Sequence, residues 1–297
     1  PGNGHQDHIA PAGFVSNEWY ALVHTPIPMP KALKIPKAAE AVQDEWDKLI
    51  KKKAWLLETV MPRSDDIKEV KKQGKRPHFG SLMDLCHEKH SELAPAFRKY
   101  KGRVVFRGDQ VRDESGYYAV FSEQGTSASH MAAAKFLDAI ARCPGNNGED
   151  SDAVGAYTQV VLEDMKEFES VETWISLPPS QRPKSWNNIV DPVCRLRLNL
   201  YGHPLAGLYW EKFCEEAILA EGFGKMKGWE CLYTHKAKQL FLSVYVDDFK
   251  MAGNAKNMAA MWIALGRTLT LEPPTALHGN VYLGCGQKEF DPPKNEV

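Results

Sequence analysis

Apolar residues recur at intervals of three and four positions in several stretches of the chain, a spacing typical of amphipathic helices. In the first stretch Ala38, Val42, Trp46, Leu49 and Ile50 share one face, and polar and charged residues fill the other. The same period predicts helices over residues 38–50, 129–142, 156–169, 207–221 and 256–269.

Shorter apolar runs between these helices have the length of β-strands. Two of them, 240–246 and 249–252, flank the pair Asp247-Asp248, which predicts a hairpin with acids at its tip. Further strands are predicted over 55–60 and 102–108. Helices and strands in this order, with an antiparallel hairpin, indicate an α+β protein.

Length and composition narrow the class of protein. A chain of 297 residues with 43% hydrophobic residues has the size of about two domains and enough apolar material for a core. No apolar run approaches the ~20 residues of a membrane helix, so no membrane partner is expected. Proline and glycine interrupt residues 1–37, which are expected to form an extended linker or tail.

Charge is distributed unevenly, although the formal net charge is only −1. Residues 31–112 hold 20 Lys and Arg against 12 Asp and Glu, whereas residues 113–297 hold 17 against 24. One part has the charge to bind a polyanion and the other has carboxylates for a metal ion, although such asymmetry is common in two-domain proteins. Six cysteines without a CxxC pair indicate reduced thiols.

The tetrad Tyr245-Val246-Asp247-Asp248 carries the clearest chemical signal. Burying adjacent carboxylates at the end of an apolar strand is unfavourable in free energy unless they contact solvent, a cation or a ligand. Two Mg²⁺ ions, about 3.5–4 Å apart, use such carboxylates in phosphoryl transfer. Asp152 is the candidate for a third ligand and Asp150 is its rival. The preference of Asp for turns and helix caps explains the same residues without a metal, and both interpretations stay open.

An ordered series of motifs resembles the reverse transcriptase of copia-type retrotransposons, the long-terminal-repeat class. The series covers about residues 38–286. Its elements are 41–46 with Trp55, 100–105 with 107–108, 121–122, Asp152 with 156–157, 193–196 with 200–202, Trp210 with 221–223, 245–248, and 282–284. Each motif is weak alone, whereas their order and spacing together form a specific pattern.

The resemblance implies a right-hand polymerase fold with fingers and palm subdomains, an antiparallel palm sheet with helices packed on one face, and a thumb that is partial or absent. Residues 38–144 are then a fingers-like region, and 145–297 a palm-like region with the start of a thumb or connection. The implied activity is that of an RNA-directed DNA polymerase. Such an enzyme uses deoxynucleoside triphosphates to extend a primer on an RNA or DNA template.

The resemblance also implies which acids carry the chemistry. Asp152, Asp247 and Asp248 are the implied catalytic residues and the implied ligands of two Mg²⁺ ions, for which Mn²⁺ can substitute.

Four further residues are implied to bind the nucleotide. Lys101 and Arg103 would approach the triphosphate, which suits their charge, although a solvated strand face explains them equally well. Ala156 and Tyr157 would lie at the nucleotide, where the Tyr157 ring beneath the sugar disfavours a 2′-hydroxyl. Ordinary core packing is the alternative for Tyr157.

Several residues depart from the family pattern. Leu205 stands where the family has a Gln near the nucleotide and the template, and Leu cannot make the same hydrogen bonds. Residues 148–151 are far more polar than the family's apolar strand before the first catalytic Asp. The alternative function is therefore a catalytically decayed remnant that retains the fold and binds nucleic acid or protein.

Location and further partners follow from the element type alone. The resemblance implies one segment of a longer polyprotein, with other polyprotein domains as additional partners. It implies reverse transcription in cytoplasmic virus-like particles, whereas a copy adopted by the host could also act in the nucleus.

Overall fold

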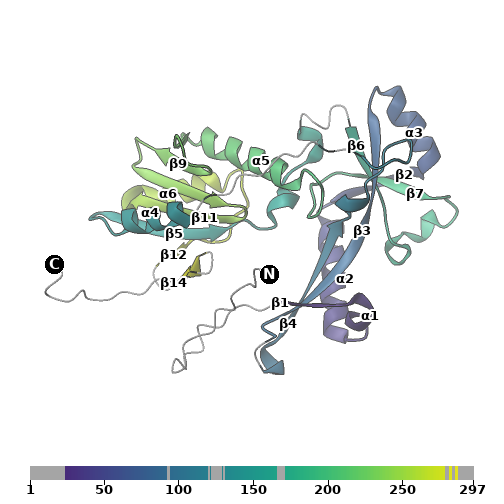
Figure 1. Cartoon of the computed structure of the whole chain (residues 1–297), viewed down its shortest axis with the longest axis horizontal. Helices are drawn as coiled ribbons and strands as arrows, with labels where there is room; N and C mark the ends of the chain where they lie inside the picture. Colours follow the sequence, from purple (N-terminus) through teal and green to yellow (C-terminus); the bar gives the residue numbers. More distant parts are fainter. Residues whose placement is uncertain are drawn as a thin grey trace, which may run out of the picture. The chain divides into compact units, whose positions relative to one another are not determined.

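The computed structural model describes residues 24–91, 94–119, 121, 129, 131–165, 171–277, 281–282 and 285–286. Residues 1–23, Ser122, 166–169 and 283–284, which take part in the predictions above, lie outside the described residues. The chain forms two compact units (Figure 1). The first unit draws on Pro1–Ala119 and Glu167–His203, and the second on Val120–Lys166 and Pro204–Val297.

The first unit is built around a six-stranded sheet with the order β1-β3-β6-β7-β2, in which β4 also pairs with β3. The pairing of β3 with β6 is parallel and the others are antiparallel. The elements are β1 (His24–Ile27), α1 (Met29–Ala32), α2 (Pro36–Lys51), β2 (Trp55–Pro62), α3 (Arg63–Lys72), β3 (Arg76–Lys89), η1 (Pro95–Phe97), β4 (Lys99–Phe106), η2 (Gly108–Gln110), β6 (Val171–Ser176), η6 (Pro179–Gln181), η7 (Lys184–Trp186) and β7 (Pro192–Leu196).

Helix α2 confirms the first predicted amphipathic helix. Pro36 occupies its first turn, where a missing N–H costs no hydrogen bond. The predicted apolar face is buried except for Ile50, which is exposed at the end of the helix. The helix lies so close to β4 that a Cβ atom at Gly102 would be 2.3 Å from the carbonyl oxygen of Ala41. Glycine at 102 therefore allows the helix to cover the sheet.

A second close approach fixes the end of β4 in the same unit. The Phe106 amide donates a hydrogen bond to the Tyr201 carbonyl at 2.8 Å. Gly202, which follows Tyr201, has φ +86°. A Cβ atom at this position would lie 2.1 Å from the carbonyl oxygen of Phe106. Only glycine fits this position, which explains the Tyr-Gly pair in the motif at 200–202.

The second unit contains the sheet β12-β5-β11-β10-β9-β8, in which every pairing is antiparallel. A short β13–β14 hairpin accompanies it. The elements are α4 (Met131–Ala141), β5 (Asn146–Asp152), η3 (Ala156–Gln159), η4 (Leu162–Asp164), α5 (Ala206–Ala220), β8 (Gly224–Lys225), β9 (Leu232–His235), β10 (Leu240–Tyr245), β11 (Asp248–Asn254), α6 (Ala255–Leu265), β12 (Thr275–Ala276), β13 (Val281–Tyr282) and β14 (Cys285–Gly286).

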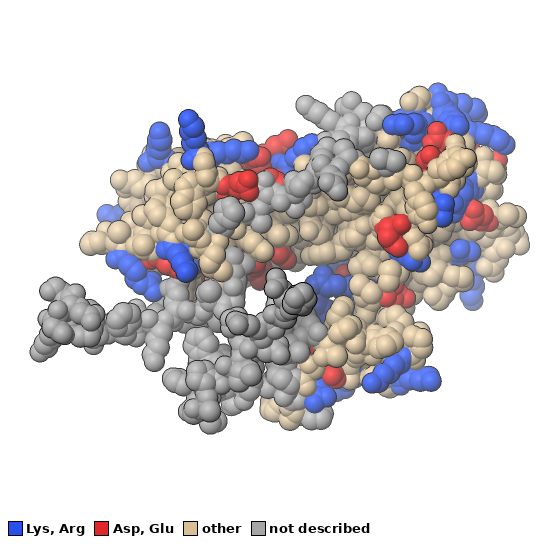
Figure 2. Space-filling view, viewed as in Figure 1, with Lys and Arg blue, Asp and Glu red and all other residues tan. Residues whose placement is uncertain are grey.

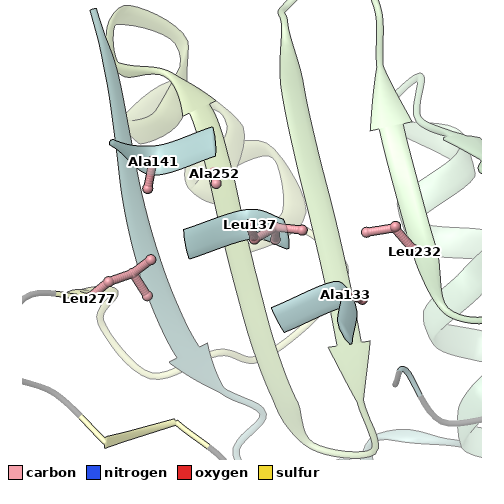
Figure 3. Packing of buried hydrophobic residues seen from close by; sticks show 6 residues of the cluster. All are labelled: Ala133, Leu137, Ala141, Leu232, Ala252 and Leu277. Atoms are coloured by element: carbon pink, nitrogen blue, oxygen red, sulfur yellow. The ribbon is translucent and has the colours of Figure 1, made fainter. Parts of the chain in front are cut away.

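Helices cover both faces of this sheet, so the prediction of helices on one face is wrong. A Cβ at Gly148 would lie 2.7 Å from the Cβ of Ala141, which places α4 on that face of β5. The next residue, Glu149, points to the opposite face and accepts a hydrogen bond from the α6 residue Trp262 at 2.8 Å. Figure 3 shows the α4 side, where α4 crosses the strands and packs in a cluster of Ala133, Leu137, Ala141, Leu232, Ala252 and Leu277.

Two local predictions are also wrong. Residues 24–37 are not an extended tail, because β1 pairs along the end of β3 and prolines begin α1 and α2. In residues 156–165, the described part of the helix predicted over 156–169, the short 3₁₀ turns η3 and η4 take its place. The Thr158 hydroxyl and the Gln159 amide bond nearby carbonyls, and such local bonds compete with a regular helix.

The two units do not coincide with the predicted regions 38–144 and 145–297. Helix α4 lies before the predicted boundary, yet it packs on β5 and β11 in the second unit. Strands β6 and β7 lie after that boundary, yet they belong to the sheet of the first unit. In the described part of the chain, no helix is both long and apolar enough to cross a membrane.

Candidate metal and nucleotide site

The hairpin of β10 and β11 carries Asp247 and Asp248, as the sequence predicts. Tyr245 pairs with Asp248, so Val246 and Asp247 form a two-residue turn. Val246 has φ +57°, a conformation that is unfavourable for a β-branched residue. A tight turn between two paired strands therefore brings two adjacent carboxylates to the edge of the sheet.

Strand β5 brings Asp152 to the same edge. Asp152 is the pairing partner of Asp248 on the neighbouring strand, and directly paired residues project from the same face of a sheet. The Ala153 amide donates a hydrogen bond to the Asp247 carbonyl at 2.7 Å, which ties the turn to the end of β5. The structure therefore brings together all three acids that the sequence singles out.

The polar composition of β5 does not prevent it from being a central strand, because its side chains have partners. The Thr275 hydroxyl donates to Asp150 Oδ1 at 2.6 Å, and the Ser151 hydroxyl donates to the Glu272 carbonyl at 2.7 Å. Glu149 accepts the Trp262 indole N–H. Asp150, the rival candidate, is buried two residue pairs away from the Asp152–Asp248 pair, whereas Asp152 is exposed at the edge.

The carboxylates at this edge repel one another. The pKa of Asp248 is raised to about 7, first by burial and then by the charges of Asp247, Asp152 and Asp150. A hydrogen bond between the Asp248 and Asp152 side chains contributes to the same shift. Such a raised pKa means that this edge of the sheet favours a proton or a cation over an additional negative charge.

The donor chemistry of the three acids fits a divalent cation. Mg²⁺ takes oxygen ligands, commonly one or two carboxylates together with water and substrate phosphates. Among the described residues, however, no three His, Cys, Asp or Glu side chains are already arranged as a metal site. Asp152 and Asp248 share a hydrogen bond instead of presenting their oxygens separately.

A buried cation lies behind the acids, and sequence reasoning missed it. Lys250 is 1% exposed and forms an ion pair with Asp138 of α4. Its ammonium lies 4.7 Å from the centre of the Tyr282 ring, and the Tyr282 hydroxyl donates to the Asp248 carbonyl at 3.4 Å. The signal in the sequence was a lysine inside the apolar run that follows Asp247-Asp248.

The turn is also held from α5, by a residue that the sequence placed only within a motif. The indole N–H of Trp210 donates to the Val246 carbonyl at 2.6 Å. A pocket of about 40 Å³ lies beside this bond and is lined by Tyr157, Gly207, Trp210, Glu211, Cys214, Cys231, Tyr233, Val244 and Val246.

The predicted nucleotide residues of the second unit lie in η3. Tyr157 is half-buried and lines the pocket beside the turn. Ala156 is 1% exposed, so its methyl group packs inside the unit. Leu205, in place of the family's Gln, precedes α5 and makes no side-chain cap for that helix.

Lys101 and Arg103 belong to the first unit, on strand β4. The Arg103 guanidinium lies 4.9 Å from the centre of the Tyr201 ring. The pKa of Lys101 is lowered by burial and then by the positive charges of Arg103 and Lys89. A lysine with positively charged neighbours is suited to binding an anion, because the anion reduces the repulsion between the positive charges.

Further basic residues gather elsewhere on the first unit. Lys68, Lys71 and Lys72 are exposed on α3, and Figure 2 shows Lys and Arg side chains concentrated over this helix. Lys68 forms an ion pair with Asp65, and Lys72 forms one with Glu69, in each case with the acid three residues earlier.

Comparison of the chain with known protein families finds no match, and comparison with curated proteins finds none either.

The raised pKa of Asp248 predicts a pH-dependent effect of Asp248→Asn on stability. Because the folded pKa of about 7 exceeds the ~3.9 of an unfolded Asp, the wild type loses stability as the pH rises through this window. Asparagine does not titrate. In a metal-free buffer we expect the variant to gain stability relative to the wild type between about pH 4 and pH 7, by about 1–2 kcal/mol after a discount for solvent screening.

Urea unfolding at several pH values measures this difference. Asp44→Asn, at an exposed position on α2, is the control for the loss of one carboxylate. A stability difference between Asp248→Asn and wild type that does not vary with pH would show that the pKa of Asp248 is not raised in the folded protein.

Proposed function

We propose that the protein is an RNA-directed DNA polymerase that extends a primer by nucleotidyl transfer. One observation carries the proposal: Asp152 and Asp248 are paired on adjacent strands, with Asp247 in the adjoining turn. Burial, and after it the charges of the neighbouring acids, raises the pKa of Asp248 to about 7, and perturbed carboxyl groups of this kind cluster at functional sites.

Asp152, Asp247 and Asp248 would hold two Mg²⁺ ions, with Mn²⁺ as a substitute. When bound, such ions neutralise charge on the attacking and leaving oxygens of a phosphoryl transfer. The protein's own contribution is positional: β5 and β11 fix two carboxylates opposite each other, and the Ala153 amide holds the turn that carries the third.

Each unit contains residues with a proposed role toward the nucleotide. Tyr157, which lines the pocket beside Val246, is proposed to contact the sugar, while the buried Ala156 supports it from within the unit. Burial and then positive neighbours lower the pKa of Lys101, and these neighbours support its proposed role, with Arg103, in binding the triphosphate. Arginine is suited to this role because its planar fork matches phosphate oxygens.

A nucleic-acid template and its primer would be the macromolecular partners. The exposed lysines of α3 and the cationic side chains of β4 supply positive charge on a protein whose formal net charge is −1. Because binding at phosphates releases counterions, we expect affinity for a primer–template duplex to fall as salt rises. The resemblance to a polyprotein segment supports other polyprotein domains as further partners, and a site of action in cytoplasmic particles or the nucleus.

Primer extension on poly(rA)/oligo(dT) with Mg²⁺ tests the proposal. We expect extension by the wild type, and none by Asp152→Asn or by Asp247→Asn/Asp248→Asn, because these variants remove the carboxylates at the sheet edge. Asp150→Asn is the matched control and should still extend primers, since Asn also accepts the hydrogen bond from Thr275.

Two observations favour the second candidate, a remnant that has lost catalysis. Leu205 replaces a hydrogen-bonding residue, and the described residues contain no ready set of three metal ligands. Folded wild-type protein that binds the duplex in a salt-dependent way without extending it, in Mg²⁺ or in Mn²⁺, would favour the remnant. Extension by Asp152→Asn equal to wild type would contradict the proposed catalytic acids.

Tyr157 provides a test of the nucleotide site. If its ring excludes a 2′-hydroxyl, Tyr157→Ala should increase ribonucleotide incorporation relative to deoxyribonucleotide incorporation by roughly tenfold or more, the usual effect of one steric contact. Tyr157→Phe keeps the ring and should leave this ratio unchanged. The ratio is measured by single-nucleotide extension, and an equal ratio in wild type and Tyr157→Ala would assign Tyr157 to core packing.

A further inference from the structure

Val246 occupies an unusual backbone conformation at a chemically important place. Six non-glycine residues in the described part of the chain have positive φ, and Val246, at +57°, is the one β-branched residue among them. Crowding between a branched side chain and the backbone makes this conformation unfavourable. Such a conformation persists only where the surroundings impose it, so some contact must hold Val246 in place.

Two hydrogen bonds hold successive carbonyl groups of the turn. The Trp210 indole N–H, from α5, donates to the Val246 carbonyl at 2.6 Å. The Ala153 amide, just after β5, donates to the Asp247 carbonyl at 2.7 Å. One bond therefore fixes the strained residue, and the other fixes the acid that follows it.

Trp210 is well placed to act as a rigid support. It is 2% exposed and lies on the buried face of α5, next to Tyr209 and one turn before Cys214. Val246, by contrast, is 37% exposed, so packing of its own side chain constrains the turn less.

We propose that Trp210 is a positioning residue for the acidic turn. Its indole N–H holds Val246 in the left-handed conformation, and this conformation directs Asp247 and Asp248 to the sheet edge beside Asp152. The structural part of this inference is independent of the enzyme activity. Its consequence for catalysis rests on the proposed function: loss of the bond lowers kcat, because the acids are misplaced, more than it raises the KM for the nucleotide.

Trp210→Phe removes the donor and keeps an aromatic ring. Trp262→Phe is the matched control, because Trp262 is a similarly buried tryptophan of the same unit whose indole N–H also donates, here to Glu149 at 2.8 Å. Hydrogen exchange at the Ala153 amide reports on the turn without any activity. The Leu277 amide, which donates to the Gly148 carbonyl near the other end of β5, reports on global opening.

We expect Trp210→Phe to accelerate exchange at Ala153 by about tenfold, the usual effect of losing one buried hydrogen bond, with little change at Leu277. Trp262→Phe should leave the Ala153 rate within about twofold of wild type, because its bond lies away from the turn. Equal acceleration at Ala153 and Leu277, or equal effects of the two variants, would overturn the proposal.

Val246→Gly separates positioning from ordinary packing, since glycine adopts positive φ without strain. With Trp210 intact, Val246→Gly should keep Ala153 protected, because the indole still holds the carbonyl. In the Val246→Gly background, Trp210→Phe should accelerate exchange by less than about threefold, since a turn without strain depends less on its anchor. Loss of protection in Val246→Gly alone, or fully additive effects in the double variant, would show that Trp210 does not hold this conformation.

Primer extension by the same variants links the inference to catalysis. We expect kcat of Trp210→Phe to fall by about tenfold while the nucleotide KM changes by less than about threefold. Absence of extension by the wild type would refute the proposed function, and the exchange measurements would still decide the role of Trp210.

Discussion

Repulsion among carboxylates at one sheet edge is the constraint on which the second unit depends. The antiparallel register places Asp152 opposite Asp248, and the two-residue turn adds Asp247 to the same edge. Burial and the neighbouring acids together raise the pKa of Asp248 to about 7, so a further negative charge is unfavourable there. Helices α4 and α6 pack against opposite faces of the sheet that carries these acids.

The buried polar groups around this edge of the sheet have partners of their own. Buried Lys250, two residues after Asp248 on β11, is paired with Asp138 of α4. The polar side chains of β5 are hydrogen-bonded to Thr275, Glu272 and Trp262. Burial of a polar group costs little free energy when its hydrogen-bond partner is present and much more when the partner is absent. These side chains therefore favour the observed register of β5 and contribute to its stability.

Periodicity predicted the elements whose contacts are local. The apolar face of α2, the helix α5 and the acidic hairpin of β10 and β11 all follow from residues close together in the sequence. Asp152 was chosen over Asp150 through family resemblance, and the pairing with Asp248 supports this choice.

Long-range contacts could not be predicted from these patterns. The parallel pairing of β3 with β6 joins segments about a hundred residues apart, and no local pattern encodes it. For the same reason a single boundary at residue 144 could not describe the two units, because each unit is formed by two separate segments of the chain. Trp210 and Lys250 looked like ordinary core and surface residue types, and only the fold gives them partners at the turn and behind the acids.

Binding of Mn²⁺ tests the central claim most directly, because it addresses the three acids without requiring a complete reaction. Electron paramagnetic resonance counts free Mn²⁺ in the presence of protein, primer–template duplex and a deoxynucleoside triphosphate. We predict about two ions bound per wild-type chain beyond those held by the nucleotide and duplex alone, and loss of this binding in Asp152→Asn and in Asp247→Asn/Asp248→Asn. Wild-type protein that is folded and binds no additional Mn²⁺, or variants that bind as much as the wild type, would contradict the account.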